Sequence, residues 1–192
     1  MVLFTTAYGS SHNYIWSGVS ETLKALEDNS IVPPLVDLFQ SEILLQEQKV
    51  IQGKRVDTKE LEKIINTASE YKPQVITEKL FLMLNKPEWS SRQDEIIGML
   101  IEMIDKSDKP KLLNLLFKRH EYKVDQEKWG WVAFAISKEA EDRNILEDLL
   151  KLLHSTTDRE LDLADEIYIA INSLSRRLNL HITADGLIEE EA

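Results

Sequence analysis

The sequence contains no cysteine among its 192 residues. The chain can therefore form no disulfide, no thiolate nucleophile and no cysteine-ligated zinc or iron–sulfur centre. Glycine and proline are also scarce, with six and five copies, which excludes collagen-like and low-complexity classes. Apolar runs are far shorter than the roughly 20 residues that cross a bilayer, and the N-terminal segment does not resemble a secretory signal. These absences predict a cytoplasmic protein that does not bind a membrane.

The chain has enough apolar residues to build a core, because 43% of its residues are hydrophobic. A chain of this length buries a core without a disulfide or a structural metal. Its apolar positions recur mostly at intervals of three and four residues, and long stretches of strict alternation are rare. The predicted fold class is therefore all-α, in a single domain spanning residues 1–192.

The charge is strongly negative and unevenly placed. The net charge is −11, and residues 129–192 hold 14 acidic and 6 basic residues, a balance of −8. Nucleic-acid binding relies on lysine and arginine to neutralise phosphates, so this balance argues against it. We expect the partner to be another protein with a basic surface, although acidity that only keeps the protein soluble is an equal alternative.

Helix-start signals precede most of the apolar segments. They consist of proline in the first turn, or of aspartate or threonine just before the helix. A further helix is predicted from near His12 to Asp28. The helix after Pro34, LVDLFQSEILLQEQKVI, is predicted to end near Gly53 and Lys54, and LLQEQKVIQGKRVD is predicted to contain an exposed loop. The expected starts are Pro33 with Pro34, Asp57, Pro73, Asp108 with Pro110, Asp125, Asp142, and Thr157 or Asp158.

Three segments repeat one layout, in which a short leucine-rich helix and a polar turn precede a longer helix. They are EKLFLMLNKPEWSSRQDEIIGMLIEMI, PKLLNLLFKRHEYKVDQEKWGWVAFAI and EDLLKLLHSTTDRELDLADEIYIAINSL. This layout resembles HEAT and armadillo repeats, whose helical pairs stack into a right-handed superhelix. The resemblance implies three repeats in residues 75–178, N-terminal helices or a cap in residues 1–72, and an acidic tail in residues 179–192.

The segment NKPEWSSRQDEIIGML carries a narrower resemblance. It is similar to HEAT-like immunity proteins of bacterial toxin systems, in which a tryptophan follows the first leucine helix and an acidic pair opens the second. Trp89, Asp94 and Glu95 hold those positions here. The resemblance implies that these residues contact a toxin partner.

The stretch EKWGWVAFAI is expected to be a helix that is apolar nearly all round. Gly130 lowers helix stability by about 1 kcal/mol relative to alanine, so its presence suggests a close approach of another backbone. Trp131 falls outside the predicted core face and is a candidate partner contact. The core face, at spacings of three and four residues, consists of Trp129, Val132, Ala133 and Ile136.

The last long helix is predicted to add an acidic strip beside Trp131. With its core face turned inward, its remaining face carries Asp162 and Glu166 and follows Asp158 and Glu160. This strip suits a basic partner, and an ordinary solvated helix face is the alternative. The inward residues are Leu163, Ile167, Ala170 and Leu174.

No catalytic, cofactor or metal motif was found in the sequence. His12, His120, His154 and His181 are dispersed and form no zinc-binding pair. We therefore expect no enzyme, cofactor or metal site, and a non-enzymatic binding protein, most concretely an inhibitor or immunity protein. The alternatives are an adaptor or assembly scaffold and, more remotely, a DNA glycosylase with a HEAT-like fold, which the negative charge opposes.

Overall fold

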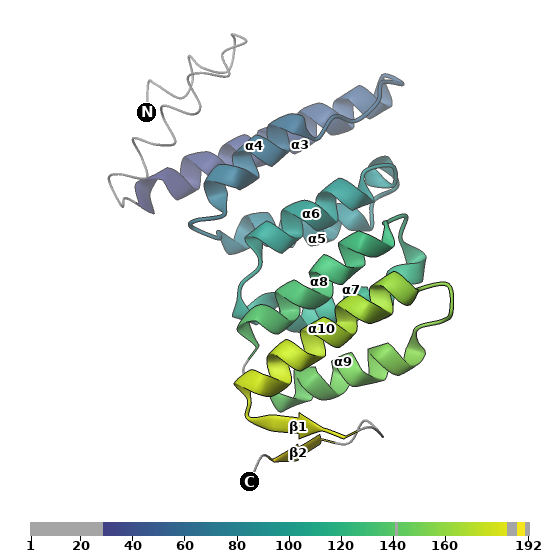
Figure 1. Cartoon of the computed structure of the whole chain (residues 1–192). Coiled ribbons are helices and arrows are strands. Elements are labelled where there is room, and N and C mark those ends of the chain that lie inside the picture. The colour runs from purple at the N-terminus through teal and green to yellow at the C-terminus, as the bar shows by residue number, and fades with distance from the viewer. Residues whose placement is uncertain (1–28, 141, 184–187, 191–192) are drawn as a thin grey trace. The chain divides into compact units, whose positions relative to one another are not determined.

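A computed structural model describes residues 29–140, 142–183 and 188–190 of the chain. Within these ranges the protein forms eight α-helices and one two-stranded sheet (Figure 1). The predicted all-α class is thus confirmed. None of the helices in the described ranges has both the length and the apolar character required to cross a bilayer. The predicted helix from His12 to Asp28 lies outside the described residues.

The helices begin close to the predicted start signals. The first four are α3 (Val32–Ile51), α4 (Lys59–Ala68), α5 (Gln74–Leu84) and α6 (Gln93–Met103). The others are α7 (Lys109–Phe117), α8 (Gln126–Glu139), α9 (Arg143–Ser155) and α10 (Leu161–Arg177). A short 3-10 turn, η1 (Asn29–Ile31), precedes α3, and three others stand between later helices: η2 (Pro87–Trp89), η3 (Lys106–Asp108) and η4 (Arg119–Glu121).

The chain divides into two compact units, one ending at Leu82 and the other beginning at Met83. In the first unit, α3 and α4 lie side by side as a helical hairpin (Figure 1). Its core consists of apolar side chains from both helices, including Leu35 and Phe39 of α3 and Leu61 and Ile65 of α4. The side-chain amide of Gln46 accepts a hydrogen bond from the Asp57 backbone N–H, which ties the connecting loop to α3.

The second unit has two layers of helices. Helix α8 contacts α6 on one side and α10 on the other, while α7 and α9 lie behind them (Figure 1). Helices α6, α8 and α10 therefore form one layer that is backed by α7 and α9.

The core faces of α8 and α10 are the predicted ones. On both helices, apolar residues spaced three and four positions apart lie on one side, and that side faces the core. All eight predicted inward side chains are buried: Trp129, Val132, Ala133, Ile136, Leu163, Ile167, Ala170 and Leu174.

One helix end agrees with the sequence prediction and one helix start differs from it. Helix α3 ends at Ile51, as predicted, and Gly53 follows it with a positive φ of 73°. Helix α10 begins at Leu161 instead of just after Thr157 or Asp158, because Thr157 to Glu160 form a separate turn closed by a bond from Glu160 N–H to Thr157 O.

The predicted acidic tail contains two short strands. Asn179, with φ of 52°, turns the chain from α10 into β1 (Leu180–Ile182). This strand pairs antiparallel with β2 (Ile188–Glu190), with His181 opposite Glu189. Since β1 also contacts α10, the hairpin continues the second unit past its last helix.

Candidate protein-binding surface

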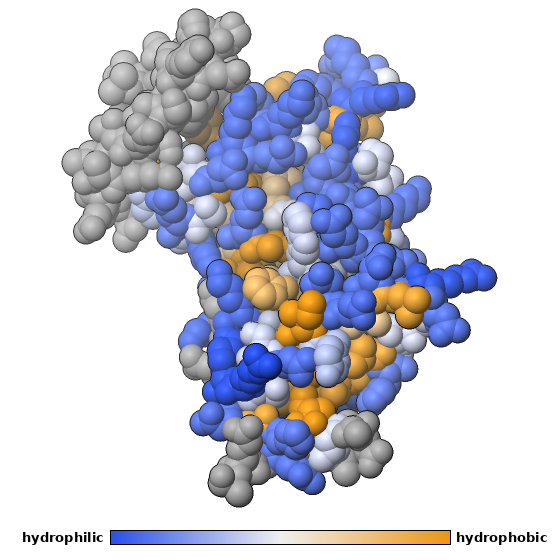
Figure 2. Space-filling model, in the orientation of Figure 1, coloured by the Kyte–Doolittle hydropathy of each residue, from blue (hydrophilic) through white to orange (hydrophobic). Residues whose placement is uncertain are grey.

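Besides Leu161 at the start of α10, four large apolar side chains are exposed on α8 and α10, and we call the surface to which they belong the α8–α10 face. Trp131 and Phe134 of α8 are 46% and 47% exposed, and Tyr168 and Ile169 of α10 are 57% and 50% exposed. Figure 2 shows hydrophobic residues gathered over these two helices between hydrophilic ones. Exposed apolar clusters of this kind are typical of protein-binding surfaces.

The helical period explains why these side chains face outward. Trp131 and Phe134 follow Glu127 at intervals of four and three residues, and Lys138 comes four residues later, so the four share one side of α8. All four are exposed, while the residues between them are buried or half-buried. The sequence prediction included Trp131 but not Phe134 or Tyr168. The same period would have found Phe134, because it lies off the core stripe.

Gly130 permits a close approach of α10 to α8, but the atoms that approach it belong to the Glu166 side chain and not, as predicted, to a backbone. A Cβ atom placed on Gly130 would lie 2.7 Å from Cγ and 2.9 Å from Cβ of Glu166. Those distances are too short for real carbon atoms, so no larger residue fits unless Glu166 or one of the helices shifts. Glu166 is consequently half-buried, with its side chain against Gly130 of α8.

We expect Gly130→Ala to destabilise the protein in spite of alanine's higher helix propensity. The propensity gain is about 1 kcal/mol, whereas overpacking costs about 1–3 kcal/mol. Gly98 of α6 provides a matched control, because its added Cβ would meet only the Lys128 Nζ atom at 3.4 Å. The free energy of unfolding of Gly98→Ala, measured with urea, should equal or exceed that of the wild-type protein. Equal behaviour of the two variants would contradict the close approach.

Lys128 connects α8 to α6 and covers part of Trp131. Its Nζ atom lies 4.4 Å from the centroid of the Trp131 ring, a cation–π contact. The same nitrogen lies next to Gly98 of α6. Lys128 thus holds the indole in place while the rest of the ring stays open to solvent.

Loop contacts align the N-terminal ends of α6, α8 and α10. The Asp125 N–H donates to Asp94 Oδ1 at 3.2 Å, which joins the start of α8 to the first turn of α6. The Gln126 side chain donates to the Arg159 carbonyl at 2.9 Å, which joins α8 to the turn before α10. The buried Gln93 side chain adds two bonds, donating to Leu84 O and accepting from Lys123 N–H.

The acidic residues predicted beside Trp131 have different surroundings. Asp158 and Asp162 are exposed, and Glu166 is half-buried against Gly130. Glu160, which the sequence prediction placed in the acidic strip, is buried instead. It therefore contributes no open charge to the surface.

Glu160 forms a buried ion pair with Arg119 of η4. Arg119 Nε and Nη2 donate to its two carboxylate oxygens at 2.7 and 3.1 Å. The Thr157 N–H and hydroxyl also donate to the carboxylate, and His120 Nε2 lies 3.8 Å from Oε1. The hydrogen bond from Arg119 lowers the pKa of Glu160 from its ordinary value of 4.5 to about 2, against the opposing effect of burial. The carboxylate is thus charged but neutralised by its partner.

The three residues proposed from the immunity-protein resemblance do not form an open site. Trp89 is 0% exposed, so its side chain belongs to the core and cannot contact a partner directly. Asp94 is half-buried and accepts the Asp125 N–H, while Glu95 forms an ion pair with Arg92 at 2.7 Å. The structure corrects the prediction for Trp89, and partner contacts by Asp94 and Glu95 stay a prediction.

In the described part of the chain, no group of histidine, aspartate and glutamate side chains has a geometry that could hold a metal ion. Comparison of the chain with protein-family models, curated proteins and solved structures gives no match. The case for a function therefore rests on the α8–α10 face itself.

Proposed function

We propose that this protein is a non-enzymatic binding protein that recognises another protein through its α8–α10 face. In the most concrete form, it is an inhibitor or immunity protein that neutralises a basic toxin domain. The proposed architecture is a right-handed superhelix of helical pairs similar to HEAT repeats, with α6, α8 and α10 as its concave layer.

The main support is the combination of open aromatic side chains and open carboxylates on one face. Trp131 and Phe134 are about half exposed, and Asp162 lies on the neighbouring helix with its charge in solvent. Large aromatic side chains often dominate the binding energy at protein interfaces. A single helix layer can therefore supply both the anchor and the charge that a basic protein needs.

Charge would act mainly on the rate and selectivity of binding. The net charge of −11 attracts a basic protein from a distance and repels acidic ones. Complementary charges at the rim of an interface raise the association rate more than they lower the dissociation rate. Exposed Asp158 and Asp162 are such rim charges.

Charge reversal at Asp162 should weaken the complex with a partner isolated from the native host at low salt. We expect Asp162→Lys to lower the association rate about tenfold, and raising the salt from about 0.05 to 0.5 M to weaken wild-type binding strongly. Glu78→Lys on α5 is a matched control with the same charge change at another exposed carboxylate. Biolayer interferometry measures both rates. Complexes that respond neither to salt nor to Asp162→Lys would exclude an electrostatic mechanism.

A further inference from the structure

Helices α8 and α10 each contain an uncharged stretch between charged ends. Residues 129–137 of α8 and residues 167–175 of α10 include no acidic or basic side chain. The four exposed apolar residues of the α8–α10 face all lie within these stretches. The face therefore has an apolar centre on both helices.

Two contacts show that the uncharged stretches run side by side in the same direction. Glu166 lies against Gly130 near the start of both stretches, and the Arg177 guanidinium donates to the Lys138 carbonyl near their end. Phe134 and Ile169 follow the first contact by about one helical turn. They therefore stand at the same level on neighbouring helices.

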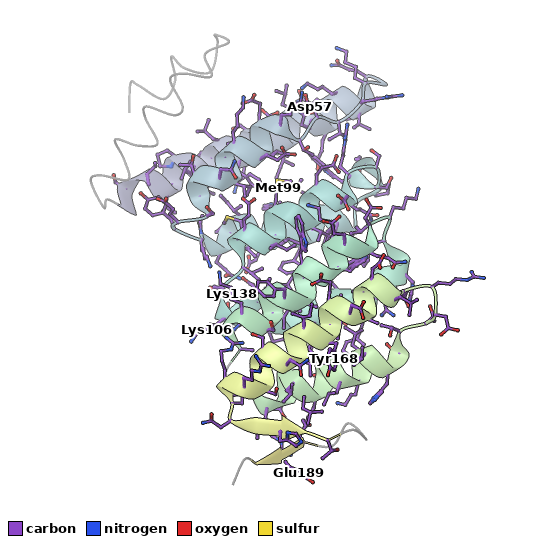
Figure 3. All side chains as sticks on the ribbon, viewed as in Figure 1. Asp57, Met99, Lys106, Lys138, Tyr168 and Glu189 are labelled. Atoms are coloured by element: carbon purple, nitrogen blue, oxygen red, sulfur yellow. The ribbon has the colours of Figure 1, made fainter. Side chains whose placement is uncertain are left out.

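The charges on either side of the apolar centre have opposite signs. Before it lie the acidic residues Glu127, Asp162, Asp165 and Glu166, with Lys128 drawn onto the Trp131 ring and Arg159 as the other base. After it lie three exposed basic residues, Lys138, Arg176 and Arg177, and one acidic residue, Glu139, so this end is basic on balance. Figure 3 labels Lys138 near the end of α8 and Tyr168 in the middle of α10. The face thus has an acidic end, an apolar centre and a basic end.

We propose that the α8–α10 face binds a helix of the partner that has an apolar centre, basic residues at one end and acidic residues at the other. This inference rests on the proposed function and specifies its partner, which is basic only at the end that meets Asp162 and Asp165. Basic residues of the partner helix are disfavoured at the other end, because they would face Lys138 and Arg176 and be repelled by them.

The dimensions of the face suit a helix. Packed helix axes are about 8–10 Å apart, and the exposed apolar side chains lie on two packed helices, Trp131 and Phe134 on α8 and Tyr168 and Ile169 on α10. Nine helical residues span about 13 Å, which is between two and three turns of a bound helix. Apolar residues at intervals of three and four on that helix would contact side chains of both helices.

Two synthetic helical peptides with the same apolar centre test the proposal. The mixed peptide carries lysines at one end and glutamates at the other, and the basic peptide carries lysines at both ends. Fluorescence anisotropy with the full-length protein at about 0.15 M salt limits the influence of distant charges. We expect the wild-type protein to bind the mixed peptide about tenfold more tightly than the basic peptide.

The double variant Lys138→Glu/Arg176→Glu should invert this preference, since both ends of the face are then acidic. Arg177 is left unchanged because it holds the end of α8. Trp131→Ala is the control that should weaken both peptides to the same extent. If the wild-type protein prefers the basic peptide, the two-ended surface is wrong while binding of a basic protein still stands. Equal binding of both peptides, or binding of neither at millimolar concentration, would also overturn the proposal.

Discussion

Replacing Arg119 by alanine is expected to lower the free energy of unfolding by about 3–5 kcal/mol, because it leaves the buried Glu160 carboxylate without its counter-charge. Both side chains are nearly inaccessible, and two hydrogen bonds join them across 41 residues of sequence. The pair also links η4 to the turn that precedes α10. Urea unfolding followed by circular dichroism measures the loss.

The Arg119–Glu160 pair should also make the stability of the protein depend on pH. The pKa of Glu160 is lowered in the folded protein to about 2 from its ordinary value of 4.5. A carboxyl group with a lowered pKa stabilises the folded state fully above the ordinary value, and this contribution is lost as the pH falls from about 4.5 to about 2. The free energy of unfolding of Glu160→Gln should therefore depend less on pH than that of the wild-type protein within this range.

Two further variants separate the ion pair from general damage. Arg143 and Glu147 form an exposed pair on α9 at 3.2 Å, so Arg143→Ala should change stability by less than about 1 kcal/mol. The double variant Arg119→Met/Glu160→Gln removes both charges and should recover most of the stability lost in Arg119→Ala. A double variant as unstable as the single one would show that packing of Arg119, not its charge, holds the turn.

Replacing Trp89 by alanine is expected to cost about 3–5 kcal/mol, the usual range for a fully buried aromatic side chain. Trp89 is the largest of the fully buried side chains. Trp131→Ala is the matched variant of the same residue type. It should cost less than about 1 kcal/mol, since it removes a half-exposed ring and one cation–π contact.

The effects of the two variants on binding should be the reverse of their effects on stability. Trp131→Ala should weaken the complex with the native partner, whereas Trp89→Ala should leave affinity unchanged in the molecules that remain folded. Thermal unfolding and binding kinetics on the two purified variants provide the comparison. If Trp89→Ala were stable but bound the partner more weakly, Trp89 would be part of the binding surface, and its assignment to the core would be wrong.

The helical periodicity of the sequence was sufficient to predict the local structure and the inner sides of the helices. Trp129, Val132, Ala133 and Ile136 are buried as their spacing predicts, because a helix turns all four toward one side. A close approach at Gly130 was also predicted, although the atoms that approach it are those of the Glu166 side chain and not of a backbone. A glycine in a helix interior lowers helix stability, so its presence favours a tertiary reason.

By itself, then, the sequence determined the helices, their inward faces and the acidic balance of the C-terminal third, since each depends on residues close together in the chain. Only the tertiary structure decided which polar and aromatic side chains remain open. Trp89 and Trp131 are the same residue type, yet Trp89 is fully buried and Trp131 is about half exposed. Glu160 does not belong to the acidic strip, because it is paired with Arg119, which is distant in the sequence but adjacent in the fold. Exposure and charge pairing depend on neighbours that folding brings together, and no local pattern encodes them.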